Sequence, residues 1–368
     1  MTEPQLSVCM IVRDEAARLS RALASVRGVA DELCVVDTGS RDDTVAIARA
    51  AGARVEVAEW TDDFAAARNR SLALATGAWV LILDADEVLD TDGGRASGAV
   101  RARLAAFATA RPGAAGQLEI VNSNGGETST FLAPRFLPRT PGLRYRGRIH
   151  EQPELEGRPL PRAPVGVRIL HAGYEAARIA SADKLARNRR LLALALADDP
   201  ADAYLWYQLG RTEHVAGAPA AALAACERAL ALVVEDAPWH APLVETTAYA
   251  LRELGRSAEA RARLAHELAR HAERADACFV AALLALDAGD VATAERGFRR
   301  ALELGANGAG ETASAASGWG ALFNLGVLRE VLGAAGEAEE LYLRALALRP
   351  GHAPIVAGLA RVRAARGT

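Results

Sequence analysis

The first 90 residues alternate between short apolar runs and segments whose apolar residues recur with helical spacing. The expected strands, some with the turn that follows, occupy residues 6–12, 32–40, 54–60 and 78–87, and the expected helices occupy residues 16–26, 42–52 and 62–77. This alternation predicts a mainly parallel sheet with helices on both faces. Ligands of such sheets bind beyond the carboxyl ends of the strands, so a functional site is expected at that edge.

Carboxylates gather where the fourth expected strand ends. The stretch WVLILDADEV, residues 79–88, starts with five apolar residues and then places Asp84, Asp86 and Glu87 within four positions. A buried carboxylate is costly unless it is paired or binds a cation. On an extended segment a spacing of two points Asp84 and Asp86 the same way, which suits a hard divalent cation that also bridges phosphates. The alternative is a polar strand end whose aspartates cap the next turn.

The first two expected strands also end in polar residues. Arg13, Asp14 and Glu15 follow the first strand in IVRDE, and Asp37 follows the second in VVDTGSRDDT, before a Gly-Ser turn and a helix N-terminus. Backbone N–H groups at such a helix start can hold an anion or hydrogen-bond a ligand. Arg68, in AAARNRS, lies on the helix that leads into the fourth strand. All of these side chains are candidates for ligand contacts.

Residues 116–174 have a different rhythm, with period-2 stretches separated by Gly and Pro. The stretches are GQLEIVNS (116–123), STFLAPRFLP (129–138), LRYRGRIHEQP (143–153) and VGVRILHAGY (165–174). We expect them to complete the same domain with some antiparallel strands.

From about residue 180 the pattern is helical and repeats internally. An alanine follows, five residues later, each of four glycines: Gly217, Gly255, Gly289 and Gly333. Four residues further on stand Cys226, Leu264, Phe298 and Tyr342. Seven residues before the four glycines stand the small residues Gly210, Ala248, Ala282 and Gly326. This pattern resembles the tetratricopeptide repeat, whose small residues let paired helices approach closely.

The copies are imperfect, with spacings of 38, 34 and 44 residues. Residues 206–210 match the opening W-x-x-L-G of the repeat and Pro350 its closing proline, whereas Glu267 replaces a small residue in the second copy. Residues 305–318 form a small-residue insertion that predicts a flexible loop. The alternative is a set of generic alanine-rich helical hairpins.

Four stretches together resemble the nucleotide-sugar domain of family 2 glycosyltransferases, which has the GT-A fold: IVRDE, VDTGSRDDT, ARNRS and LDADE. The family pattern is strand-N-E, strand-D-x-G-S-x-D-x-T, a helical N and strand-D-A-D, and here Asp14 stands in place of the usual asparagine. The stretches at 146–153, 169–174 and 184–192 resemble a bacterial subgroup that fuses this domain to tetratricopeptide repeats. Some members of that subgroup are peptide S-glycosyltransferases.

The resemblance implies a site for a nucleotide-sugar donor, a UDP-sugar above all. The site is expected to contain Arg13, Glu15, Asp37, Arg68, Asp84 and Asp86. Asp37 would bind the uracil or ribose, and Asp84 the ribose or a metal-bound water. Asp86 would bind Mn²⁺ or Mg²⁺ directly, and the metal would neutralise the diphosphate as leaving group. Arg68 would add positive charge near the diphosphate, unless it is simply a solvated helix residue.

The resemblance also implies a histidine metal ligand and a general base. His171, on an apolar strand, is the expected ligand beside the two aspartates, with His150 left open and a purely structural histidine as the alternative. Inverting transfer needs a base that takes the acceptor's proton. Glu151 is the first candidate for this catalytic role and Glu87 the second.

Composition agrees with an ordinary globular protein rather than a nucleic-acid or membrane binder. The chain has 368 residues, a formal net charge of -3 and a sequence pI near 6.2. No apolar run is long enough to cross a bilayer, and no signal peptide is visible at the N-terminus. The four cysteines form no CxxC pair, so reduced thiols in a cytoplasmic protein are expected.

We therefore expect an α/β GT-A domain over residues 1–178 and an all-α repeat domain of about four repeats over residues 179–368. The repeats would bind a peptide or protein acceptor, or build a homodimer. One alternative is a non-catalytic scaffold that carries a degenerate sugar-nucleotide domain. Another is a nucleotidyltransferase, but that class would want a glycine-rich loop near the first strand, where IVRDEAARL has no glycine.

Overall fold

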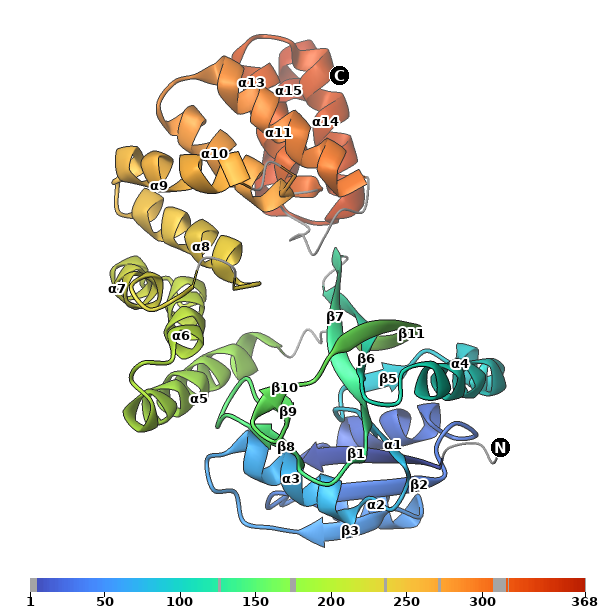
Figure 1. The fold of residues 1–368 in the computed structure, drawn as a ribbon. Helices are drawn as coiled ribbons and strands as arrows, with labels where there is room; N and C mark the ends of the chain where they lie inside the picture. Colours follow the sequence, from blue (N-terminus) through green and yellow to red (C-terminus); the bar gives the residue numbers. More distant parts are fainter. Residues whose placement is uncertain are drawn as a thin grey trace. The chain divides into compact units, whose positions relative to one another are not determined.

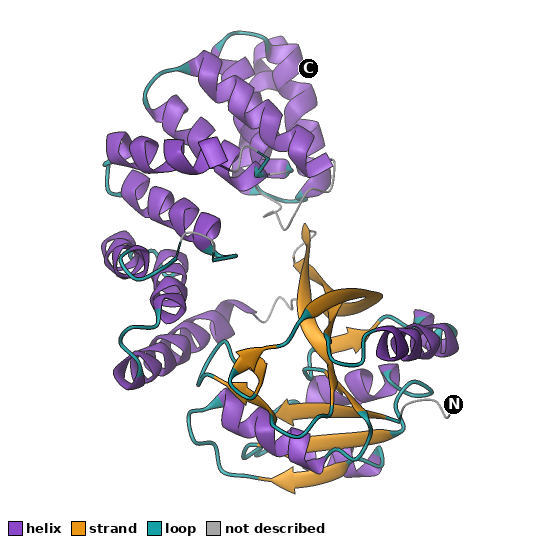
Figure 2. Ribbon diagram, viewed as in Figure 1, coloured by secondary structure: helices purple, strands orange, loops and turns teal. Residues whose placement is uncertain are grey.

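The structure is a computed structural model that describes residues 5–124, 127–172, 177–234, 237–270, 273–306, 316 and 318–367. It divides into two compact units (Figure 1). The N-terminal unit contains Met1–Ser123 and Thr130–Tyr174, and the C-terminal unit contains Asn124–Ser129 and Glu175–Thr368. Figure 2 shows strands and helices together in the first unit and helices throughout the described part of Glu175–Thr368.

The N-terminal unit begins with the alternation expected from the sequence. Its strands are β1 (Leu6–Val12), β2 (Glu32–Asp37), β3 (Arg54–Val57), β4 (Trp79–Ile82), β5 (Glu87–Leu89), β6 (Ala115–Asn124), β7 (Glu127–Pro138), β8 (Leu143–Arg146), β9 (Gln152–Leu155), β10 (Arg158–Pro159) and β11 (Arg162–Ala172). Its longer helices are α1 (Ala16–Ser25), α2 (Thr44–Ala50), α3 (Phe64–Leu74) and α4 (Ser97–Ala110). The helix α4 is absent from the elements expected from the sequence.

The main sheet has the strand order β3-β2-β1-β4-β7-β6-β11-β5. Its first half is parallel, because β1 pairs with both β2 and β4 and β2 pairs with β3 in that sense. In the second half, β7 runs antiparallel to β4, and β5 runs antiparallel to β11. The expected α/β sheet with some antiparallel strands is confirmed. A second sheet has the order β10-β9-β8.

Apolar side chains cover both faces of the main sheet. On one face Leu19, Leu23 and Leu104, from α1 and α4, are buried in one cluster with Val8 and Leu81 of β1 and β4. On the other face a second cluster joins α3 and the small sheet to the opposite sides of the same strands; it includes Cys9, Cys34, Val80, Ile82 and Tyr145. The near-continuous apolar character of β1 and β4 follows from this burial on both faces.

The C-terminal unit is a row of helix pairs. The helices are α5 (Ala177–Asp198), α6 (Ala203–Val215), α7 (Pro219–Leu230), α8 (His240–Glu253), α9 (Ser257–Arg270), α10 (Ala275–Asp287), α11 (Val291–Ala306), α13 (Trp319–Val331), α14 (Ala335–Leu348) and α15 (Ala353–Arg366). Each aligned glycine of the sequence repeat lies between the two helices of a pair, with φ between 69° and 76°. That left-handed conformation favours glycine, because other residues strain there. The expected helical repeat domain is confirmed.

The small residues of the repeat lie where paired helices touch. A Cβ added to Gly210 of α6 would lie 2.4 Å from the Cys226 sulfur of α7. A Cβ added to Gly326 of α13 would lie 2.7 Å from the Tyr342 ring of α14. In each of these pairs a glycine on one helix faces a larger side chain on the other, and this sets how closely the two helices pack.

Two remaining expectations concern the cysteines and the insertion loop. All four cysteines are buried and free, as expected. Most of the expected flexible loop at 305–318 lies outside the described residues. In the described part of the chain, none of the helices combines the length and the apolar character that crossing a membrane requires.

Candidate active site

The chain turns directly after β4. Because β4 ends at Ile82 and β5 begins at Glu87, Asp84 and Asp86 lie between two strands rather than on one extended segment. Glu87 closes this turn twice: its N–H donates to the Asp84 carbonyl at 3.0 Å, and its Oε2 accepts the Asp84 N–H at 2.9 Å. The expectation that Asp84 and Asp86 lie on one continuous extended strand is therefore wrong.

Asp84 is held by two arginines. Arg68 Nη2 donates to its Oδ1 at 2.7 Å, and Arg135 Nη2 donates to its Oδ2 at 3.0 Å. Burial alone would raise the pKa of Asp84, but the two guanidinium charges outweigh burial and hold that pKa well below its usual value. Asp84 is thus an ionised carboxylate that is already neutralised by its neighbours.

The two candidate bases belong to the same cluster. Glu151 Oε1 accepts from Arg68 Nε at 3.0 Å, and Glu87 Oε1 lies 2.5 Å from Arg135 Nη2. Glu87 is 4% exposed, and burial raises its pKa despite the Arg135 charge. Arg68 therefore links Asp84 to Glu151, while Arg135 links Asp84 to Glu87. This confirms that Arg68 is no solvated helix arginine.

Arg135 is a site residue that the sequence reasoning missed. It lies on β7 between Pro134 and Phe136, in a stretch expected only to be a strand. Its side chain is 16% exposed and touches two carboxylates that lie 48 and 51 positions away. A lone arginine inside the apolar run FLAPRFLP, residues 131–138, was the available signal, because a buried cation needs paired anions.

His171 contacts Asp86 at the edge of the sheet. Its Nε2 lies 3.1 Å from Asp86 Oδ2, and its Nδ1 lies 2.7 Å from Asn122 Oδ1. In the sheet His171 stands in register with Asn122 of β6 and with Glu87 of β5. His150 lies in the loop between β8 and β9 with φ 55°, next to Glu151. Strand pairing thus brings Asp86 and His171 together from positions 85 residues apart.

The Asp86–His171 pair fits a small divalent cation. A carboxylate oxygen and an imidazole nitrogen 3.1 Å apart are close enough to hold one small divalent cation between them. Such an ion usually takes one or two protein ligands and completes its shell with waters and substrate phosphates. Within the described ranges, no cluster of three or more His, Cys, Asp or Glu side chains is arranged to hold a metal ion. Asp84, the third expected ligand, instead has both oxygens in arginine pairs.

The two carboxylate oxygens of Asp37 have different surroundings. Its Oδ1 accepts the backbone N–H groups of Gly39 and Ser40 at 3.0 and 2.9 Å, which shapes the turn after β2. Gly39 has φ 102°, a conformation that other residues rarely adopt. Asp37 is 1% exposed, and its Oδ2 has no hydrogen-bond partner among the described residues. A buried carboxylate oxygen without a donor is costly, so this atom suits a ligand N–H or hydroxyl.

The residues after β1 have mixed roles. Arg13 is half exposed, and its Nε lies 3.9 Å from Asp14 Oδ2. Asp14 ties this loop to the next one: its N–H donates to Ser40 Oγ at 2.8 Å, and its Oδ1 accepts the Arg41 N–H at 2.7 Å. Glu15 pairs with Arg18.

The charge of Asp86 affects the pKa of Glu15. Burial raises the pKa of Glu15, and repulsion from Asp86 adds to that rise, although the Arg18 charge opposes it. The structure thus brings Glu15 within the electrostatic range of Asp86, while the Arg13 side chain extends into solvent.

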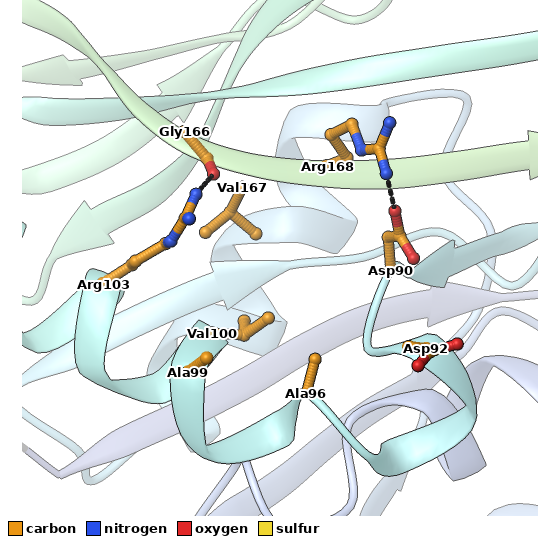
Figure 3. Close-up of a pocket in the computed structure, with 9 residues that line it drawn as sticks. All are labelled: Asp90, Asp92, Ala96, Ala99, Val100, Arg103, Gly166, Val167 and Arg168. Atoms are coloured by element: carbon orange, nitrogen blue, oxygen red, sulfur yellow. Dashed lines mark hydrogen bonds and ion pairs between the residues drawn. The ribbon is translucent and has the colours of Figure 1, made fainter.

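A cavity of about 250 Å³ lies beside α4 and β11, and none of its nine lining residues is an expected site residue (Figure 3). Three of its four charged side chains, those of Asp90, Arg103 and Arg168, are bonded to one another or to the backbone. Arg103 Nη1 donates to the Gly166 carbonyl at 2.7 Å, and Arg168 Nη2 lies 2.6 Å from Asp90 Oδ2 (Figure 3). The carboxylate and histidine cluster is therefore the stronger candidate for a site.

Residues 7–93 match the family model described as glycosyl transferase family 2. The chain carries a family 2 glycosyltransferase domain. The matched segment spans β1 to β5 and so contains Asp37, Arg68, Asp84 and Asp86, whereas Glu151 and His171 lie beyond it. The glycosyltransferase domain is followed by the helical repeats, in the order expected from the sequence.

Two relatives share parts of this chain. A TPR repeat-containing protein of Synechococcus elongatus is 40% identical over 221 residues, which are 56% of this chain and 51% of that protein. The SPbeta prophage-derived glycosyltransferase SunS of Bacillus subtilis is 28% identical over 219 residues, 58% of this chain and 50% of SunS. The chain therefore spans about half the length of each relative.

Among solved structures, the APC/C hetero-tetramer Cut9–Hcn1 gives a TM-score of 0.45 at 18% identity, over 50% of this chain and 34% of that one.

Proposed function

We propose that the glycosyltransferase domain transfers a sugar from a nucleoside diphosphate sugar with the help of Mn²⁺ or Mg²⁺. The observation that carries this proposal is the pair of Asp86 and His171, 3.1 Å apart at the strand-end edge of the sheet. The family model supports the reaction class, since it covers the segment that contains Asp86. The proposed donor is a UDP-hexose or a UDP-N-acetylhexosamine, which follows from the family resemblance.

Each site residue has a physical role in this proposal. Asp37 Oδ2 would accept a hydrogen bond from the uracil N–H or a ribose hydroxyl, because it is buried without a partner. Asp86 and His171 would hold the cation, which neutralises the diphosphate and makes it a better leaving group. Arg68 and Arg135 keep Asp84 ionised and fixed, and they add positive charge to the same edge.

Glu151 is the proposed general base. The acceptor oxygen or sulfur attacks the anomeric carbon, the bond to the diphosphate breaks, and the acceptor proton passes to Glu151, with inversion. Glu87 fits this role less well, since its side chain is 5% exposed and both of its oxygens are bound, one by Arg135 and one by the Asp84 N–H. Glu151 is 14% exposed and binds Arg68 through Oε1.

The proposed acceptor is a peptide or protein that reaches the site through the repeats. Stacked helical repeats build extended surfaces that suit such partners. The repeats would otherwise serve to build a homodimer. Sedimentation of the full chain with and without a candidate acceptor separates these two uses.

Replacement of Asp86 by alanine is expected to weaken UDP binding in the presence of Mn²⁺ by more than about 100-fold. Groups that merely orient a metal ligand account for about 10–100-fold of metal affinity, so loss of a ligand itself should exceed that range. Titration calorimetry of UDP, with Mn²⁺ and with EDTA, measures the effect. Asp43→Ala is the matched control, because Asp43 is exposed near the same edge and caps no helix N–H. Equal UDP and Mn²⁺ binding by Asp86→Ala and wild type would contradict the assignment.

A further inference from the structure

We propose that Asn122 is a positioning residue that fixes the imidazole of His171 so that Nε2 faces the cation at Asp86. This inference rests on the proposed metal-dependent function and adds a residue that lies outside the segment matched by the family model. Asn122 and His171 are register partners on the adjacent parallel strands β6 and β11, so the backbone itself holds the two side chains side by side.

Both ring nitrogens of His171 face side-chain oxygens. Nδ1 lies 2.7 Å from Asn122 Oδ1, and Nε2 lies 3.1 Å from Asp86 Oδ2. A neutral imidazole has one N–H, so it can donate to one of these two oxygens. In the proposed tautomer the hydrogen is on Nδ1, at the shorter of the two distances, and Asn122 Oδ1 accepts it. The lone pair of Nε2 is thereby directed at the Asp86 carboxylate.

In that tautomer the Nε2 lone pair and the Asp86 oxygen, 3.1 Å apart, repel each other unless a cation binds between them. Asp86 and His171 would hold a divalent cation here, and its charge would offset that repulsion. The side chains of His171 and Asp86 are 32% and 39% exposed, so the cation can also reach a ligand diphosphate and water. Asn122 thus acts through His171, by the hydrogen bond that orients a histidine ligand.

The fold itself does not require an asparagine at this position. Alternation along β6 puts Asn122 on the same face as Leu118 and Ile120, which are 0% and 1% exposed. A leucine at position 122 would continue that apolar row. The polar amide of Asn122 stands in this row and bonds to His171.

The test compares Asn122→Leu and Asn122→Asp with wild type in calorimetric titrations of UDP, with Mn²⁺ and with EDTA. Asn122→Leu should weaken UDP binding about 10–100-fold in Mn²⁺ and leave it unchanged in EDTA, because only the metal ligand is disturbed. Asn122→Asp keeps an oxygen acceptor for Nδ1–H and should retain binding in Mn²⁺. A purely structural role predicts the reverse order, since a half-buried carboxylate disturbs a core edge more than leucine does. Gln117→Leu, on the opposite face of the same strand, is the matched control.

A second measurement reads the imidazole directly. Nitrogen NMR of the histidine side chains, assigned with His171→Ala, should show His171 protonated at Nδ1 in wild type with Mg²⁺, a diamagnetic ion, and UDP. In Asn122→Leu that preference should be lost. Wild type that binds UDP equally with Mn²⁺ and EDTA overturns the proposed function. Wild type that binds UDP with Mn²⁺, matched by an equally tight Asn122→Leu with the same tautomer, overturns this inference alone.

Discussion

Replacing Arg68 with methionine should lower the stability of the glycosyltransferase domain by about 3 kcal/mol. Removing one partner of a buried ion pair typically costs about 3–5 kcal/mol, because the remaining charge stays buried without compensation. The lower end applies here, since Asp84 is 32% exposed and keeps Arg135 as a partner. Glu151 is 14% exposed, so leaving its charge without Arg68 costs more free energy than it does at Asp84. Native-state hydrogen exchange of peptides across 64–89 measures this domain apart from the repeats.

The matched control is Arg70→Met on the same helix. Arg70 pairs with Glu56 at 3.1 Å, but the two side chains are 54% and 37% exposed. Exposed pairs contribute about 0–1 kcal/mol, so this substitution should leave the exchange rates of the same peptides nearly unchanged. Equal losses in Arg68→Met and Arg70→Met would show that the buried cluster adds no special stability.

Replacing Tyr342 with alanine should destabilise the repeat domain by about 3–5 kcal/mol, the usual range for deleting a buried aromatic side chain. Tyr342 is fully buried in a cluster with Leu322, Ile355 and neighbours from α13 and α15. Its hydroxyl also lies 2.6 Å from Glu330, and that bond is lost as well. Urea unfolding, with hydrogen exchange of peptides across 319–362, gives the change in stability.

A double-mutant cycle tests the contact between this ring and the opposite helix. A Cβ on Gly326 would lie 2.7 Å from the ring of Tyr342, so Gly326→Ala should cost about 1–3 kcal/mol by overpacking. In the Tyr342→Ala background the same change should stabilise the helix, because alanine is a better helix former than glycine by about 1 kcal/mol. Gly336→Ala is the control, since a Cβ there meets nothing within 4 Å. A cost for Gly326→Ala that is the same in both backgrounds would contradict the packing account.

Local periodicity was sufficient to predict the parallel half of the sheet. The strands β1 and β4 are buried on both faces, and this leaves continuous apolar runs that can be read without any alignment. The helix pairs were likewise predictable, because the aligned glycines occupy turns with positive φ that restrict the residue type. The family resemblance was enough to predict that Asp86 and His171 form a pair. In the structure, the pairing of β11 with β5 brings them together.

The missed features depend on contacts between distant parts of the chain. The turn at Asp84 is closed by the Glu87 side chain. The sequence of these residues does not by itself distinguish this turn from an extended strand. The order of β6, β7 and β11 depends on pairing across long connections, which the local pattern does not encode. Arg135 becomes a site residue only because β7 is paired with β4. Its partners are 48 and 51 positions away in the chain.

The most direct test of the account is slow hydrolysis of a panel of nucleotide sugars by the full chain, with Mn²⁺ and with EDTA, followed as UDP release. The cluster at Asp86 and His171 predicts metal-dependent release from one UDP-sugar, and that donor would name the transferred sugar. Absence of release from every donor, together with no UDP binding in calorimetry, would contradict the proposed transferase and leave a repeat scaffold with a degenerate sugar-nucleotide domain.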